Sequence, residues 1–247
     1  MKKIIIVGNQ FAEFANNQTI FTYDQFQYML ETEPSDSQNK YHIYIGQGLS
    51  DLKIASTHKI LKSSVLADRF SFIGSMQRNK RAVSYFDPNK FIISEPEKMS
   101  EYLFKCYLML DDSDDITEQH IQGTVLLEAV QQMVKSISTK FFISSLKNEK
   151  KSFVLNQVNS TFMEYVFPLD VEFIFKLEQF RYGLDDNFNA AGMIQVKQNK
   201  KIMMSVDIDF SIMEKNTLLN IESHMAVLAV NDIINGPNLR LVEQFAA

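Results

Sequence analysis

The segment from residue 121 to residue 141 has the hydrophobic pattern of a helix that is apolar around most of its circumference. At about 100° per residue, its apolar side chains cover roughly 240° of arc, far more than the stripe of an ordinary surface helix. These residues are Val125, Leu126, Leu127, Ala129, Val130, Met133, Val134, Ile137 and Phe141. Such a helix must be covered on several sides, so the pattern predicts that a sheet wraps around it.

Candidate strands lie on both sides of this helix in the sequence. The clearest is "KIMMSVDIDFSIM", which alternates apolar and polar residues and predicts a strand with one buried and one solvent-exposed face. Two further strands, in "VEFIFKLEQFRYG" and "AGMIQVKQ", precede it, and short turns at "GLDDN" and "QNKK" predict an antiparallel meander of all three. Before the helix, "RFSFIGSM" and "YLFKCYLML" are the other candidates. The predicted class is α+β.

The chain divides into three predicted parts. Residues 1–54 read as strand, helix and strand and form an N-terminal appendage, residues 55–216 form the main domain, and residues 217–247 form a C-terminal helical tail. The appendage resembles the start of a nucleotide-binding unit. However, "VGNQFAEF" lacks the second and third glycines that let a backbone approach a pyrophosphate, and no Walker lysine follows. We therefore expect packing or partner contacts there and no nucleotide.

Composition excludes several functional classes. A net charge of -5 gives no electrostatic footprint for nucleic acid or an anionic membrane. The apolar run at the amino terminus is too short for a signal peptide or a membrane span, which predicts a cytoplasmic protein. With one cysteine and four histidines the sequence has no disulfide framework and no zinc-ligand spacing. We expect no metal and no cofactor, and Cys106 reads as a small buried apolar residue.

Two motifs carry a resemblance to a known family. The string "HIQGTVLLEAVQQ" has a His three residues before a Gly, followed by an apolar triplet, Glu-Ala and Gln. Upstream, "THKILKSSVLADRFSF" has a His-Lys pair and an apolar-rich run. With the His-Lys motif first and the His-Gly-Glu motif second along the chain, residues 55 to about 215 resemble the A-factor biosynthesis hotdog family. The resemblance implies a hotdog fold, in which a curved antiparallel sheet wraps a long central helix.

The resemblance also implies an activity. Members of that family resemble acyltransferases that move a β-ketoacyl group from acyl carrier protein or coenzyme A to a small hydroxylated acceptor, a step toward signals and secondary metabolites. Relatives commonly carry two such domains, whereas this chain has length for one, so a homodimer is expected. One departure matters: the family tends to have Arg where this sequence has Gln131. The charge that this Arg would supply is either absent here or comes from elsewhere, with Arg69, Arg78, Arg81 and Arg181 as candidates.

The residue types around the helix start suit acyl transfer. Negative charge develops on the thioester carbonyl oxygen, and free backbone N–H groups at a helix N-terminus stabilise it. Gly123 lacks a Cβ and would let that oxygen approach closely. Glu128 is the candidate general base, if partial burial raises its pKa, and His120 would orient substrate or share the proton transfer.

Further candidates contact substrate in this hypothesis. Thr124, Gln131 and Gln132 share the polar stripe of the helix with Glu128, and His58 belongs to the second motif. Related dehydratases have a catalytic His about fourteen residues before the Glu. Here that position is Asp114, which is a further candidate for substrate contact, and the replacement argues against a dehydratase of the usual type.

Each candidate also has a purely structural interpretation. Glu128 could be a surface carboxylate paired with Gln132, and His120 could cap or pack against the helix. Gly123 could serve close packing at the helix start, which does not exclude the oxyanion role. His58 could be structural, and the acidic loop around Asp114 could simply be solvated.

Three functional classes therefore remain open. The favoured one is an acyltransferase or related thioester enzyme. The second is a thioesterase or hydratase on the same scaffold, in which water replaces the acceptor alcohol. The third is a non-catalytic acyl-binding or scaffold protein, which would bind acyl carrier protein without turnover.

Overall fold

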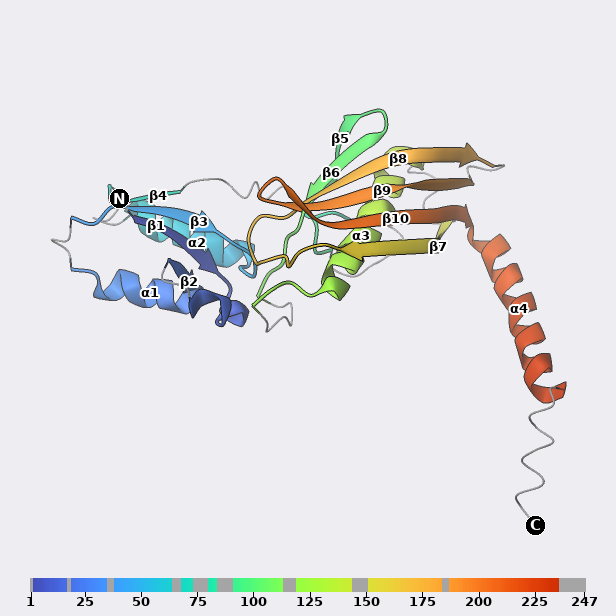
Figure 1. The fold of residues 1–247 in the computed structure, drawn as a ribbon, viewed down its shortest axis with the longest axis horizontal. Coiled ribbons are helices and arrows are strands. Elements are labelled where there is room, and N and C mark those ends of the chain that lie inside the picture. The colour runs from blue at the N-terminus through green and yellow to red at the C-terminus, as the bar shows by residue number, and fades with distance from the viewer. Residues whose placement is uncertain are drawn as a thin grey trace, which may run out of the picture.

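The computed structural model shows two β-sheets joined in one molecule (Figure 1). It describes residues 2–16, 19–34, 38–63, 68–72, 80–83, 91–112, 119–143, 151–183 and 187–235. A parallel sheet lies in the N-terminal unit, which we define as residues 2–72, and an antiparallel sheet follows in residues 97–214. In Figure 1 the N-terminal unit and the last helix lie at opposite ends of the antiparallel sheet.

The N-terminal unit is an open parallel sheet of four strands in the order β2-β1-β3-β4. Its first helix begins with a capping box, in which Thr22 accepts from the Gln25 backbone and Gln25 accepts from the Thr22 backbone. The strands are β1 (Lys2–Val7), β2 (Ile20–Thr22), β3 (Tyr41–Ile45) and β4 (Phe70–Phe72). The helices are η1 (Asn9–Phe11), η2 (Phe14–Asn16), α1 (Tyr23–Thr32) and α2 (Asp51–Ser63). The predicted strand-helix-strand order of the first fifty residues is therefore present.

The second sheet has six antiparallel strands in the order β5-β6-β8-β9-β10-β7. Consecutive strands β8, β9 and β10 form the predicted meander, and their turn places Asn199 (φ 51°) and Lys200 (φ 67°) in the left-handed region. The strands are β5 (Glu97–Ser100), β6 (Leu103–Tyr107), β7 (Lys151–Phe162), β8 (Glu172–Tyr182), β9 (Phe188–Gln198) and β10 (Lys201–Glu214).

A long helix, α3 (Gly123–Ile137), packs against this sheet and continues into the single π-helical turn η3 (Ser138–Phe142) (Figure 1). Its apolar side chains lie in the main core together with the inward faces of the strands. The buried apolar residues of α3 are Leu126, Ala129, Val130, Met133, Val134 and Ile137. The prediction of a helix covered by an antiparallel sheet is confirmed.

The alternation predicted for β10 is confirmed along most of the strand, but Ser211, predicted on the solvent-exposed face, is buried. Val206, Ile208, Phe210 and Ile212 are buried, whereas Asp207 is exposed on the other face. A bulge near Met203 interrupts the pairing with β9 and turns this extra residue into the molecule, where it is also buried.

The boundary between the parts differs from the prediction. A division after residue 54 falls inside α2, and "RFSF" forms β4, which pairs with β3 of the parallel sheet instead of opening the antiparallel sheet. The reason is that α2 and β4 complete a strand-helix-strand unit, and Leu61 and Phe70 join the core of that unit. The second family motif therefore lies in the N-terminal unit.

The N-terminal unit is joined to the antiparallel sheet by the loops after β1 and β3. Gln47 is fully buried; its Nε2 donates to the carbonyls of Leu108 (3.2 Å) and Leu169 (3.1 Å), and its Oε1 accepts from the Leu110 amide (3.0 Å). Apolar residues that follow β1, including Phe11, belong to the same core as α3. The two sheets are thus parts of one packed structure.

The last helix, α4 (Lys215–Asn235), starts directly after β10 and extends away from both sheets (Figure 1). A helix in this tail was predicted from about residue 217. Among the described residues no helix is long and apolar enough to cross a membrane.

Candidate functional site

The N-terminus of α3 carries free backbone donors. Gln122 precedes the helix in an extended conformation, and its carbonyl accepts from the amides of Val125 (3.1 Å) and Leu126 (3.3 Å). The amides of Gly123 and Thr124 come too early for an acceptor within the helix, and no acceptor for them is found among the described residues. A partial positive charge is therefore available at this end of α3.

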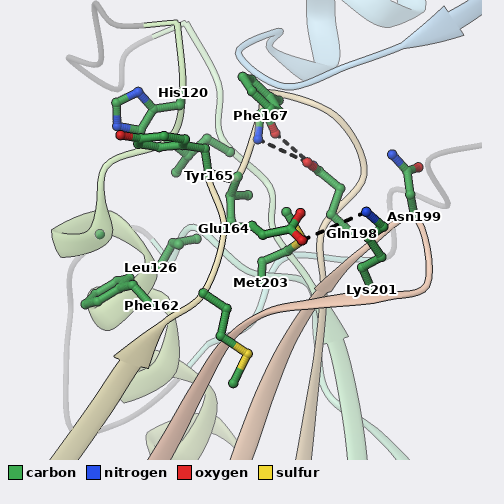
Figure 2. A pocket seen from close by; sticks show the side chains of 14 residues that line it. His120, Leu126, Phe162, Glu164, Tyr165, Phe167, Gln198, Asn199, Lys201 and Met203 are labelled. Carbon is green, nitrogen blue, oxygen red and sulfur yellow. Dashed lines mark hydrogen bonds and ion pairs between the residues drawn. The ribbon is translucent and has the colours of Figure 1, made fainter.

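A cavity of about 890 Å³ opens at this helix end (Figure 2). It lies between the start of α3, the connection from β7 to β8, and the hairpin between β9 and β10. Most of its walls are apolar, and a few polar side chains stand among them. The apolar lining residues are Ile121, Leu126, Phe162, Met163, Val166, Phe167 and Met203. A mostly apolar cavity with a few polar groups is the usual form of a small-molecule site.

The β7–β8 connection, residues 163–171, forms one wall of the cavity and is held by several hydrogen bonds. The Ile121 amide donates to the Val166 carbonyl (2.7 Å), which ties this wall to the start of α3. Gln198, which is buried, accepts from the Phe167 amide (3.1 Å) and donates to the Phe167 carbonyl (2.9 Å). The wall is therefore fixed from both α3 and β9.

The N-terminal unit supports the same wall from outside. The ring of Phe14 stacks on the ring of Phe167 at 5.5 Å, with an interplanar angle of 20°. Next along the chain, the Pro168 carbonyl accepts from the Gln47 amide (3.0 Å). In Figure 2 Phe167 lies at the edge of the cavity nearest the N-terminal unit.

Gly123 lies directly beneath the ring of Phe162. A Cβ added to Gly123 would lie 2.7 Å from Cε1 of that ring, so glycine is required for the ring to lie where it does. The structural interpretation of Gly123, close packing at the helix start, is thus present in the geometry. Since Phe162 is half exposed, its ring can move, and the helix amides behind it can then be reached.

Two pairs of polar side chains stand at the cavity. His120 meets the ring of Tyr165 edge-on, with the centroids 4.8 Å apart (Figure 2). On the other side, Nζ of Lys201 lies 3.9 Å from Oε1 of Glu164. Both members of the second pair are more than half exposed, so this ion pair is weak.

Glu128 lies away from this cavity. It follows Gly123 by five residues, which places it about 140° around the helix axis. Its side chain is exposed and accepts from Nε2 of Gln132 (3.0 Å), whose Oε1 accepts from the buried Ile92 amide (2.7 Å). The predicted pairing of Glu128 with Gln132 is present, whereas the partial burial expected for Glu128 is not found in the single chain.

The other predicted residues are spread over the molecule. Thr124 is exposed one turn before Glu128, and Gln131 is half-buried. His58 lies in α2, where its ring stacks on Phe72 at 3.9 Å, and burial and then the Lys62 ammonium lower the pKa of its imidazole. Asp114 lies outside the described residues.

Three of the four arginines considered as a replacement for the family's Arg are described by the structure, and none of these three lines the cavity. Arg69 pairs with Glu33 in the N-terminal unit (2.9 Å). Arg81 pairs with Asp111 (3.2 Å). Arg181 lies in a small polar depression on the other face of the sheet, and Arg78 is outside the described residues. Lys201 is the cation that lines the cavity among the residues described.

The structure thus brings His120 and Gly123 together and separates them from Glu128 and Gln132. It also adds residues that the sequence analysis did not select. They are Phe162, Glu164, Tyr165, Gln198 and Lys201. Their sequence signal was weak: "TFMEYVF" lies in a connection between strands, and Gln198 and Lys201 belong to a hairpin that was interpreted only as a turn.

Comparisons with known proteins give little beyond this geometry. No protein-family model matches the sequence, and no curated protein is significantly similar to it. Among solved structures, a mutant thioesterase from Pseudomonas aeruginosa gives a TM-score of 0.37 at 9% identity, covering 48% of this chain and 80% of its own. A thioesterase from Haemophilus influenzae gives 0.37 at 13% identity, covering 49% and 78%.

A mutant of a thioesterase from Staphylococcus aureus gives a TM-score of 0.38 at 12% identity, covering 49% of this chain and 93% of its own. At these values the similarity assigns no reaction to the present chain. Across the residues that the structure describes, no group of three or more His, Cys, Asp or Glu side chains is placed to hold a metal ion.

Proposed function

We propose that this protein binds acyl thioesters and transfers the acyl group to a small hydroxylated acceptor. The observation that carries the proposal is the apolar cavity that opens at the free amides of Gly123 and Thr124. An acyl chain would lie against the apolar walls, and the thioester carbonyl would point at the helix end. The thiol part, on acyl carrier protein or coenzyme A, would remain outside.

The helix end supplies the electrophilic part of the chemistry. As the acceptor oxygen attacks the thioester carbon, negative charge develops on the carbonyl oxygen, and the amides of Gly123 and Thr124 stabilise it. For these amides to be reached, the ring of Phe162 must turn away from Gly123. The C–S bond then breaks, and the carrier leaves as a thiol after taking up a proton.

Glu128 is the proposed acceptor of the proton from the attacking hydroxyl. Because Glu128 lies about 140° from Gly123 on α3, one chain does not place both groups at one thioester. A homodimer, in which Glu128 of one copy faces the cavity of the other, would unite them and would bury the carboxylate. We therefore propose a symmetric homodimer with the site at its interface, acting in the cytoplasm.

The same arrangement serves water as the acceptor, in which case the product is a free acid and the protein is a thioesterase. The product of turnover separates these alternatives. A panel of acyl-coenzyme A and acyl carrier protein thioesters, offered with and without hydroxylated acceptors, gives released thiol as the rate. Product mass then distinguishes an ester from a free acid.

A specific observation favours a second candidate, an acyl-binding protein without turnover. Glu128 is exposed and already hydrogen-bonded to Gln132, as expected of a surface carboxylate. In this alternative the cavity and helix end hold an acyl group, but no base completes the reaction. Tight binding of an acyl thioester with no thiol release would identify it.

The decisive variant is Glu128→Gln, which keeps the shape of the side chain but cannot accept the proton. Single-turnover transfer should fall by roughly two to four powers of ten, while thioester binding and thermal stability change little. Glu178→Gln, an exposed carboxylate on β8, is the matched control and should transfer at the wild-type rate. Transfer by Glu128→Gln at the wild-type rate would show that Glu128 is not the base.

A companion variant tests the helix end. Gly123→Val places a branched side chain against Phe162 and in front of the helix amides. Both thioester binding and the rate should fall, whereas Glu128→Gln should affect the rate alone. Thermal melts of each variant check that the fold is retained.

A further inference from the structure

Helix α4 is left almost entirely uncovered by the rest of its own chain. Every side chain from Leu219 to Ile234 is exposed, including eight large apolar ones that are 44% to 69% exposed. They are Leu219, Ile221, Met225, Val227, Leu228, Val230, Ile233 and Ile234. A helix that is apolar on more than one side is normally buried. The apolar side chains of α4 are therefore ones that another surface would be expected to bury, and in the single chain they are exposed.

The apolar residues of α4 include a seam suited to contact with another protein surface. Leu218, Ile221, Met225 and Leu228 follow one another at spacings of three, four and three residues. This spacing places them within an arc of roughly 80° and is the pattern by which one helix packs on another. A polar stripe of Asn220, His224 and Asn231 runs beside the seam.

Helix α4 lies on the same side of the molecule as one edge of the antiparallel sheet, the edge formed by β7. Strand β7 ends the sheet and pairs only with β10 among the described strands. From residue 152 to residue 162 it has neither a charged residue nor a proline, the usual protections of an exposed edge. Helix α4 contacts both β10 and β7, and in Figure 1 it leaves the molecule on the β7 side.

We infer that α4 packs on a second copy of this chain, across the free edge of β7. A strand edge can pair with its own copy around a twofold axis, and the same axis brings a second α4 to that side. Each copy then supplies one helix and covers one. A second copy satisfies both exposed features at once, whereas an unrelated partner would need two separate matching surfaces.

The exposed area is of the right size for such an association. If each large apolar side chain of α4 still has about half of its 60–120 Å² to bury, the three exposed ones in the seam offer roughly 140 Å² per chain, and all eight, which lie on several sides of the helix, offer roughly 400 Å². A stable interface buries roughly 800 Å² per partner, so the second copy must cover α4 on more than its seam and must also cover the β7 edge.

This inference rests on the homodimer of the proposed function and names the surface that forms it. A seam variant that stays dimeric would refute this surface and leave the proposed transfer standing. A monomeric wild type would refute both this surface and the shared site, and a dimer without thioester transfer would support the surface alone. The double variant Met225→Glu/Leu228→Glu places two charges in the seam. The matched control Asn220→Glu/Asn231→Glu places the same charges on the polar stripe of the same helix.

Light scattering and sedimentation of the full chain at micromolar concentration give the result. Wild type and control should have twice the 28.5 kDa mass of one chain, and the seam variant should have 28.5 kDa. A monomeric wild type, a dimeric seam variant, or dissociation of the control as well would each overturn the inference. Circular dichroism checks that both variants keep their helix content.

A second measurement covers the case in which the seam variant fails to fold. Cys106 is buried, and burial raises the pKa of its thiol, so an introduced cysteine can be labelled selectively. An environment-sensitive fluorophore on Met225→Cys should shift to the blue as protein concentration rises through the dissociation constant. The same label on Asn220→Cys should change little. Equal responses at the two positions would contradict the inference.

Discussion

The two segments that flank the antiparallel sheet, the N-terminal unit and α4, are attached in opposite ways. The N-terminal unit presents fully buried Gln47 to three backbone groups of the neighbouring chain segments, and its Phe11 joins the main core. Helix α4 makes few contacts and exposes apolar side chains along its length (Figure 1). Both segments lie largely outside the family resemblance, yet only the first is covered by its own chain.

The difference shows how an appendage can be classified from its contacts. Buried amides that are fully hydrogen-bonded hold a segment in one position, because leaving any of those groups without a partner is costly. An apolar helix without cover has no such fixed position within its own chain. The first is therefore part of the fold, and the second is a surface for another molecule.

The largest effect is expected where the N-terminal unit is packed most closely. A Cβ on Gly8 would lie 2.0 Å from the carbonyl oxygen of Gly48, and neither backbone segment can yield without separating the loops after β1 and β3. Gly8→Ala should therefore prevent folding of the N-terminal unit or remove most of the stability of the protein. Circular dichroism and a thermal melt measure this.

The matched control for Gly8 is Gly183→Ala, since the nearest atom to its added Cβ is the Asn187 carbonyl oxygen at 3.4 Å. That variant should melt close to wild type. If Gly8→Ala also melts close to wild type, the N-terminal unit is held less tightly than its contacts indicate, and the contrast with α4 weakens.

An intermediate effect is expected at Gln47. Gln47→Leu keeps a similar size but leaves two carbonyls and one amide without their side-chain partner in a buried place, which should cost about 3 kcal/mol. Denaturant unfolding gives the value. Gln10→Leu, which loses one part-buried bond to the Asp111 carbonyl, is the comparison and should cost about 1 kcal/mol. If both variants lose the same free energy of unfolding, the complete burial of Gln47 does not increase the cost of losing its hydrogen bonds.

The smallest effect is expected from nucleotides. In open parallel sheets ligands bind at the carboxyl ends of the strands, and here the loops at the ends of β1 and β3 are packed against the antiparallel sheet. ATP and NAD should therefore give no saturable heat in calorimetry and no shift in melting temperature. Saturable binding that requires residues 1–50 would show that these loops open, and the N-terminal unit would then be less firmly attached than we infer.

The sequence was most informative where hydrophobic periodicity was long. Helix α3 and strand β10 each repeat their pattern over many residues, so their faces were predicted correctly. Strand β7 was missed because "NQVNST" has too few apolar residues to show alternation, and its pairing with β10 is a long-range contact. The short β5 was not predicted either, because "EKMS" contains a single large apolar residue.

The candidate site was predictable in part. A glycine at the start of an apolar helix indicated the helix end, and the structure places a cavity there. The separation of about 140° between Gly123 and Glu128 follows from their spacing alone. Which of the two residues faces the cavity depends on where the strands lie around the helix, and the sequence could not show that. Nor could it show Tyr165 or Gln198, whose positions are set by tertiary contacts.

The stack between Phe14 and Phe167 has a consequence for how this protein can diverge. A wall of the cavity is supported by a side chain that is not among the residues lining the cavity, so substitutions at Phe14 can reshape the cavity while the residues at the helix end stay unchanged. Selection for longer or shorter ligands can therefore act first on the N-terminal unit. In such a lineage the appendage would change faster than the helix that it indirectly serves.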